Sequence, residues 1–113
     1  LLNYQINRFA KIIESLTVLP ENMQQNMDKT YGLIYSQRVM LTLIDAGLTR
    51  EAAYDLVQPL TKIAWDESES FEELVKSNEI INEKLSKDEI DKLFDSSYHL
   101  TQVDTIFKRV GLD

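Results

Sequence analysis

Few side chains of this sequence could take part in acid–base or metal chemistry. The one histidine, His99, lies in the stretch Ser-Ser-Tyr-His-Leu, and an imidazole can serve as a general base or a metal ligand near neutral pH. A metal site needs further His, Cys or carboxylate ligands at suitable spacing, and none accompanies His99. The spacing favours a packing or capping role near a helix start, and a general base for a substrate held elsewhere is the alternative.

The charged side chains also have structural interpretations. Arg38 lies within an apolar stretch and Asp45 is two turns away, so we expect a structural ion pair with another element rather than an anion site. The pairs Glu72-Glu73 and Asp88-Glu89 fall in predicted first turns of helices, where negative charge is stabilised. Ser86 begins a capping-box pattern. The sequence therefore predicts no catalytic, cofactor-binding or metal-ligating residue.

Composition narrows the class of protein. The chain has 113 residues, 43% of them apolar, and a net charge of −7 that arises entirely from residues 66–113. An acidic second half argues against nucleic-acid binding, which needs clustered Lys and Arg. Cysteine is absent, and neither a membrane-spanning run nor a signal-peptide pattern occurs. We expect a cytoplasmic protein without a membrane partner, and we expect the acidic side chains to form a solvated outer layer.

The stretch Gly32–Gly47 is the predicted centre of the fold. Most of its circumference is apolar, with Leu33, Ile34, Met40, Leu41, Leu43 and Ile44 on one arc that Val39 and Ala46 widen. It therefore predicts one helix around which the others pack. Ser36 and Gln37 fall inside this arc, where unsatisfied polar groups are costly. We expect both to hydrogen-bond to backbone or a neighbouring helix, and the alternative is that they face a substrate cleft.

The first residues indicate a helix that belongs to a larger bundle. Apolar residues follow a 4-3-4-3 spacing within Leu1–Val18, at Leu2, Ile6, Phe9, Ile13 and Leu16. No capping residue and no initiator Met precede them. We therefore interpret this helix as continuing one that begins upstream.

The remaining sequence predicts further helices and no strand. Pro20–Asp28 begins with proline at a helix start. Arg50–Glu67 is capped by Thr49, with Pro59 expected to kink it and Trp65 expected to close one end of the core. Its predicted inner stripe is Ala53, Leu56, Leu60 and Ile63. Short helices capped by Ser70, Asn78 and Ser86 follow, and the last is predicted over Leu100–Val110. The fold class is all-α: the end of a long bundle helix and a compact domain of short and medium helices.

Several of these segments together resemble one enzyme family. The runs Gly-Leu-Ile-Tyr-Ser-Gln-Arg-Val-Met-Leu from Gly32 and Ala-Gly-Leu-Thr-Arg-Glu-Ala-Ala-Tyr from Ala46 are similar to the C-terminal part of bacterial adenylosuccinate lyases, of the fumarase/aspartase superfamily. Shorter matches support this: Asn7-Arg8-Phe9, Leu19 to Met23, Val57-Gln58-Pro59, Ala64-Trp65, Tyr98-His99-Leu100 and Val103 to Phe107. The resemblance covers essentially the whole chain.

The resemblance implies a function for the parent protein. Such enzymes are all-helical homotetramers that cleave adenylosuccinate, and the related succinylcarboxamide ribotide of purine synthesis, by β-elimination that releases fumarate, without a cofactor. Residues 1–19 would end a central-bundle helix, and residues 20–113 would form the C-terminal helical domain. The family's Ser-Ser, Lys and Asn loop does not occur here, and His99 matches neither catalytic histidine. The fragment itself is expected to be inactive; the alternative is an independent acidic helical protein-interaction module.

Overall fold

The computed structural model describes residues 1–112, and these form helices without any strand. The all-α prediction is therefore confirmed. In chain order the elements are α1 (Leu2–Glu14), α2 (Pro20–Asp28), the 3-10 helix η1 (Leu33–Tyr35), α3 (Ser36–Asp45), α4 (Arg50–Glu67), α5 (Phe71–Ser77), α6 (Glu79–Lys84), α7 (Lys87–Leu93), the 3-10 helix η2 (Ser96–Leu100) and α8 (Val103–Arg109). Within residues 1–112 no helix combines the length and apolar composition that a bilayer crossing requires.

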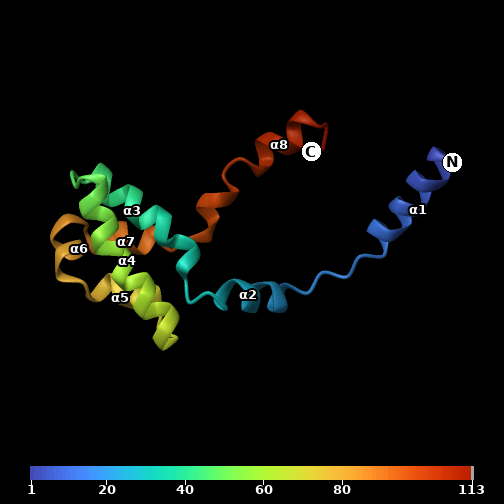
Figure 1. Ribbon diagram of the computed structural model, residues 1–113. Coiled ribbons are helices and arrows are strands. Elements are labelled where there is room, and N and C mark those ends of the chain that lie inside the picture. Colours follow the sequence, from blue (N-terminus) through green and yellow to red (C-terminus); the bar gives the residue numbers. More distant parts are fainter. Residues whose placement is uncertain (113) are drawn as a thin grey trace.

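The helices divide into a packed body and two arms. Helices α3 to α7 form the body, with α1 and α2 extending from one end of the sequence and α8 from the other (Figure 1). The molecule measures 60 × 32 × 24 Å, with a radius of gyration of 19.5 Å. A compact domain of this length would have a radius of gyration of about 13 Å. The arms therefore account for a shape much longer than that of a globular domain.

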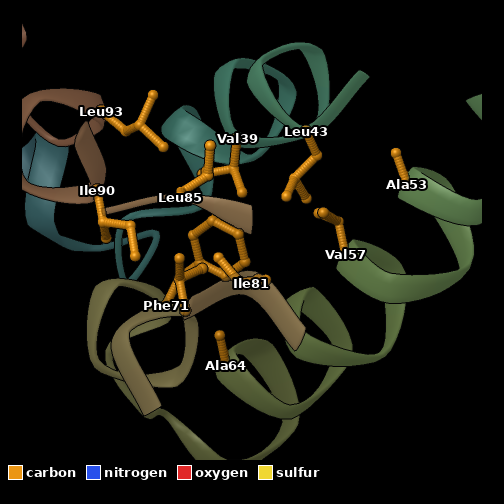
Figure 2. Packing of buried hydrophobic residues seen from close by; sticks show 11 residues of the cluster. Val39, Leu43, Ala53, Val57, Ala64, Phe71, Ile81, Leu85, Ile90 and Leu93 are labelled. Atoms are coloured by element: carbon orange, nitrogen blue, oxygen red, sulfur yellow. The ribbon is translucent and has the colours of Figure 1, made fainter. Parts of the chain in front are cut away.

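One apolar core holds the body together. Helix α3 packs most extensively on α4, and α5, α6 and α7 close the remaining sides (Figure 2). The ring of Phe71 is fully buried near the centre of this cluster. The buried residues are Val39, Leu43, Ala53, Val57, Ala64, Phe71, Val75, Ile81, Leu85, Ile90 and Leu93.

The four predicted helix caps are confirmed. The side chains of Thr49, Ser70, Asn78 and Ser86 each accept a hydrogen bond from the backbone N–H three residues on, at 3.2, 3.4, 3.1 and 3.3 Å. The Glu89 carboxylate also accepts the backbone N–H of Ser86 at 2.9 Å, which completes the capping box. These caps satisfy amide groups that have no partner within their own helix.

The central helix lies between its two glycines, but its first turn is a 3-10 helix and its buried side differs from the prediction. Gly32 and Gly47 adopt positive φ angles of 84° and 102°. Val39 and Leu43 are fully buried, whereas Ile34 and Leu41, which belong to the same predicted arc, are about half exposed. The body contacts only one side of α3, so its opposite apolar side stays open to solvent. The expectation that other helices surround it is wrong for residues 1–112.

Helix α4 continues through Pro59 without a break. Of its predicted stripe, Ala53 is fully buried, while Leu56, Leu60 and Ile63 are only partly buried. Val57 and Ala64 complete the buried side instead. Trp65 is 60% exposed, so the expectation that it closes the core is wrong.

Both predicted terminal helices are shorter in the structure. Helix α1 ends at Glu14, four residues before the predicted end, and it buries no residue. The predicted helix over Leu100–Val110 is divided: η2 ends at Leu100 and α8 begins at Val103. Helix α8 likewise buries no residue.

Candidate functional site

Arg38 connects the central helix to the end of α7. Its Nη1 donates to the backbone carbonyls of Leu93 and Asp95, at 3.0 and 3.1 Å. The last carbonyls of a helix carry partial negative charge, so a guanidinium there is stabilised. The expected structural role is confirmed, but the expected ion pair is wrong: the hydrogen-bond acceptors of this guanidinium are main-chain oxygens, not a carboxylate.

A series of aromatic contacts leads from the Arg38 guanidinium to the edge of the core. The Arg38 guanidinium lies 4.0 Å from the ring centroid of Tyr98, within the range of a cation–π interaction. Tyr98 meets the His99 ring edge to face at 5.4 Å, and His99 stacks on Tyr35 at 6.4 Å. Tyr35 contacts Phe94 at 5.4 Å. These contacts attach η2 to the body and give His99 the packing role that the sequence favoured.

Asp95 holds the start of η2. Its carboxylate accepts the Ser97 hydroxyl at 2.7 Å and the Ser97 backbone N–H at 2.9 Å. These bonds, with a smaller attraction from Arg38, lower the pKa of Asp95. These bonds favour the charged form of the carboxylate and make it a weaker proton acceptor than an ordinary aspartate.

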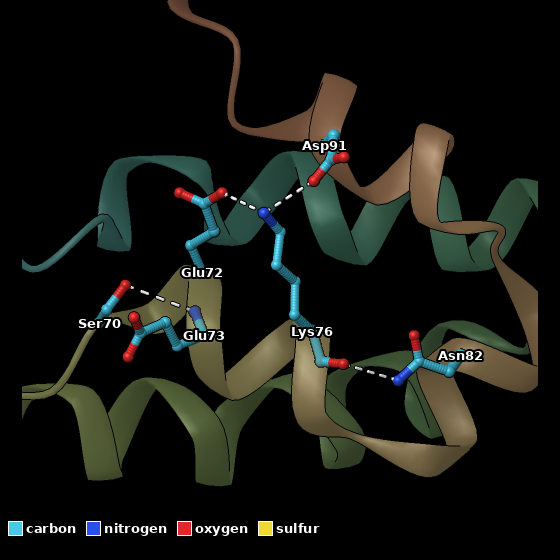
Figure 3. Close-up of polar contacts among 6 residues, drawn as sticks. All are labelled: Ser70, Glu72, Glu73, Lys76, Asn82 and Asp91. Carbon is cyan, nitrogen blue, oxygen red and sulfur yellow. Dashed lines mark hydrogen bonds and ion pairs between the residues drawn. The ribbon is translucent and has the colours of Figure 1, made fainter.

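A second polar cluster joins α5 to α7 (Figure 3). Lys76 Nζ lies 2.7 Å from Asp91 Oδ1 and 2.7 Å from Glu72 Oε1. The hydrogen bond to Asp91, and then the one to Glu72, raises the pKa of Lys76. Asn82 Nδ2 donates to the Lys76 carbonyl at 2.8 Å, and so ties α6 to the end of α5. A protonated lysine between two carboxylates links helices and is unsuited to act as a base.

A shallow groove of about 430 Å³ runs between α3 and α4. Ser36 and Gln37 line it on the α3 side, facing Tyr54 and Gln58 of α4. Neither the Ser36 nor the Gln37 side chain forms a hydrogen bond within the part of the chain that the structure describes, so that expectation is wrong. The groove contains amide and hydroxyl groups but no charged side chain.

These candidates do not converge on one catalytic centre. Arg38 and His99 meet through Tyr98, whereas Ser36 and Gln37 line the separate groove. Glu72 pairs with Lys76, and Glu89 completes a helix cap. Across residues 1–112 no three His, Asp or Glu side chains come close enough together to hold a metal ion.

Two participants were missed from the sequence. Lys76 follows Glu72 by four residues, a spacing that predicts a pair on one helix face; its second partner, Asp91, comes from another helix. Tyr98 carries no comparable signal, because its contact with Arg38 spans sixty residues of chain. The sequence therefore indicates contacts between residues a few positions apart, such as Glu72 and Lys76, but not contacts between distant helices.

Comparison with known proteins shows which family the chain resembles. The model of a family described as "Adenylosuccinate lyase C-terminus" matches residues 32–110. Adenylosuccinate lyase of Bacillus subtilis is 58% identical over 111 residues, which are 98% of this chain and 26% of that protein. The enzymes of Streptococcus mutans and Staphylococcus saprophyticus are 52% and 51% identical over 112 residues, which are 99% of this chain and 26% of those proteins.

The helical body engages carboxylates and cations in helix caps and interhelical bonds. The chain belongs to the family of adenylosuccinate lyase C-terminal segments. It spans about a quarter of the length of the curated relatives it matches. This membership favours a segment of a lyase over an independent acidic interaction module.

Proposed function

We propose that the chain is the C-terminal part of an adenylosuccinate lyase. The parent enzyme breaks a carbon–nitrogen bond of adenylosuccinate by β-elimination and releases AMP and fumarate; the succinylcarboxamide ribotide of purine synthesis is its second substrate. The observation that carries the proposal is 58% identity with the Bacillus subtilis enzyme across 98% of this chain. The proposal also includes that the parent enzyme is a soluble homotetramer of the cytoplasm and needs no cofactor.

Within that enzyme, residues 1–113 provide a helical frame and no catalytic group. Support comes from the contacts of the best candidates. Arg38 is engaged with main-chain carbonyls and Tyr98, and Lys76 with two carboxylates. His99 packs between Tyr98 and Tyr35. Proton removal and protonation of the leaving nitrogen then fall to residues outside this segment.

The test is a segment exchange. The matching C-terminal quarter of the Bacillus subtilis enzyme is replaced by residues 1–113, and the cleavage of adenylosuccinate by the purified exchanged enzyme is measured. We expect kcat/KM within about tenfold of the parent value, a difference of roughly 1.4 kcal/mol. The same enzyme carrying Leu43→Asp is the control for folding, because this change places a charge in the core. An exchanged enzyme that folds as a tetramer but does not cleave adenylosuccinate would refute the proposal.

A further inference from the structure

Helix α8 presents an apolar face that the rest of the chain does not cover. The face consists of Val103, Ile106, Phe107 and Val110, at the i, i+3, i+4 and i+7 spacing of one helix side. Ile106, Phe107 and Val110 are between 50% and 66% exposed, and Val103 is partly buried. The opposite side carries polar residues such as Thr105 and Lys108. This is the pattern of a helix that packs against another element along one side.

This helix is too short to persist by itself. It has seven residues, and no residue of it is buried. Isolated helices below about 12 to 15 residues are marginal in water, because their stability in proteins comes mostly from packing. A partner surface is therefore required to hold α8 in place.

Two observations identify this surface. Figure 1 shows α8 leaving the body on the same side as the α1 arm. Helix α1 itself exposes the apolar seam that includes Ile6 and Phe9. The chain corresponds to about a quarter of its relatives, whose matched part is their C-terminus. The remaining three quarters of such a protein would join this chain through α1, on the side to which α8 extends.

A second copy of α8 is a poor alternative partner. Seven residues span about 10 Å of helix, whereas a stable interface between separate proteins buries at least about 1,200 Å². A contact within one polypeptide needs no such area, since covalent linkage supplies a high effective concentration. A contact with a neighbouring subunit of the proposed tetramer is the outcome that a cross-linked product of two-subunit mass would reveal.

We propose that the apolar face of α8 docks onto the helical region that precedes α1 in the same subunit, and so forms a second link between the body and that region. This inference rests on the proposed function, because the docking surface belongs to the full-length lyase. The α8 helix then acts as a second attachment point, separate in sequence from α1 by the whole body.

The first experiment compares two contexts. Phe107→Ala is introduced into residues 1–113 alone and into the exchanged enzyme, with Thr105→Ala, on the opposite side of the helix, as the matched control. We expect Phe107→Ala to leave the unfolding of the body unchanged in the isolated chain and to lower the melting temperature of the exchanged enzyme by several degrees. Equal effects of the two substitutions in the exchanged enzyme would overturn the docking.

The second experiment identifies the partner. A benzoylphenylalanine photo-cross-linker replaces Phe107 in the exchanged enzyme, and the product is analysed by denaturing electrophoresis and peptide mapping. We expect a product of single-subunit mass, joined to a helix upstream of residue 1. A product of two-subunit mass, a link to residues 20–112, or no protein cross-link would each contradict the proposal. Cleavage of adenylosuccinate is measured separately, so loss of activity with the expected cross-link refutes the lyase assignment and not the docking.

Discussion

The guanidinium of Arg38 lies 4.0 Å from the ring centroid of Tyr98 while it donates to two carbonyls at the end of α7 and just beyond it, those of Leu93 and Asp95. One side chain of the central helix thus joins the end of α7 to η2. Because η2 leads directly into the α8 arm, this contact determines where that arm leaves the body (Figure 1).

Replacing Arg38 should therefore destabilise the body. Arg38→Lys keeps the charge but cannot stack on Tyr98 and also reach both carbonyls, because an ammonium lacks the planar fork of a guanidinium. We expect the free energy of unfolding to fall by about 1–2 kcal/mol, measured by urea denaturation. Arg50→Lys, at an exposed helix start, is the control. Equal stability of the two variants would show that these contacts contribute nothing.

The capping box of α7 provides a local test. Ser86→Ala removes the hydroxyl that accepts the Glu89 N–H, and we expect a loss of about 1 kcal/mol in the same denaturation experiment. Lys87→Ala at the neighbouring exposed position should change stability little. If both variants unfold alike, the cap is not a stabilising element.

The same cap predicts that the contribution of Glu89 to stability depends on pH. Hydrogen bonds from the Ser86 hydroxyl and then from its backbone N–H lower the pKa of Glu89 below its usual value of 4.5. A carboxylate with a lowered folded-state pKa contributes stability above its unfolded pKa and loses this contribution as the pH falls through the folded value. We expect NMR titration of Glu89 to show this lowered pKa, and Ser86→Ala to return it toward the ordinary value. An unchanged titration after the substitution would contradict this cause.

Core and exposed leucines of one helix should respond differently. Leu43 is fully buried and Leu41 is 49% exposed. In the isolated chain we expect Leu43→Ala to cost about 2–5 kcal/mol and Leu41→Ala less than about 1 kcal/mol. Thermal unfolding followed by circular dichroism measures both. A similar cost at the two positions would mean that α3 packs by a different side.

Local chemistry explains which features could be predicted from the sequence. The caps at Thr49, Ser70, Asn78 and Ser86 depend on a side chain and an amide three residues apart. Because both groups of each cap lie close together in the sequence, the residue types and their spacing are enough to predict the hydrogen bond. The all-α class follows from the same short-range patterns.

Long-range relationships explain what could not be predicted. The apolar arc of α3 is wider than the surface that α4 and α7 cover, so hydrophobicity alone did not show that Val39 is buried and Leu41 is not. Arg38 finds its acceptors 55 and 57 residues away. Trp65 faces solvent although tryptophan is usually well buried. The contacts of the candidate site depend on such long-range relationships, which a single sequence does not show.

The most direct test of the supporting role is the turnover number of the exchanged enzyme with His99→Ala. His99 is the one imidazole of this segment, and hence its only side chain that ordinarily changes charge near neutral pH. If residues 1–113 supply a frame and no acid or base, kcat for adenylosuccinate cleavage stays within a few-fold of the unsubstituted exchanged enzyme. A loss of about 100-fold or more, at an unchanged melting temperature, would place general acid–base catalysis within this segment and contradict the account.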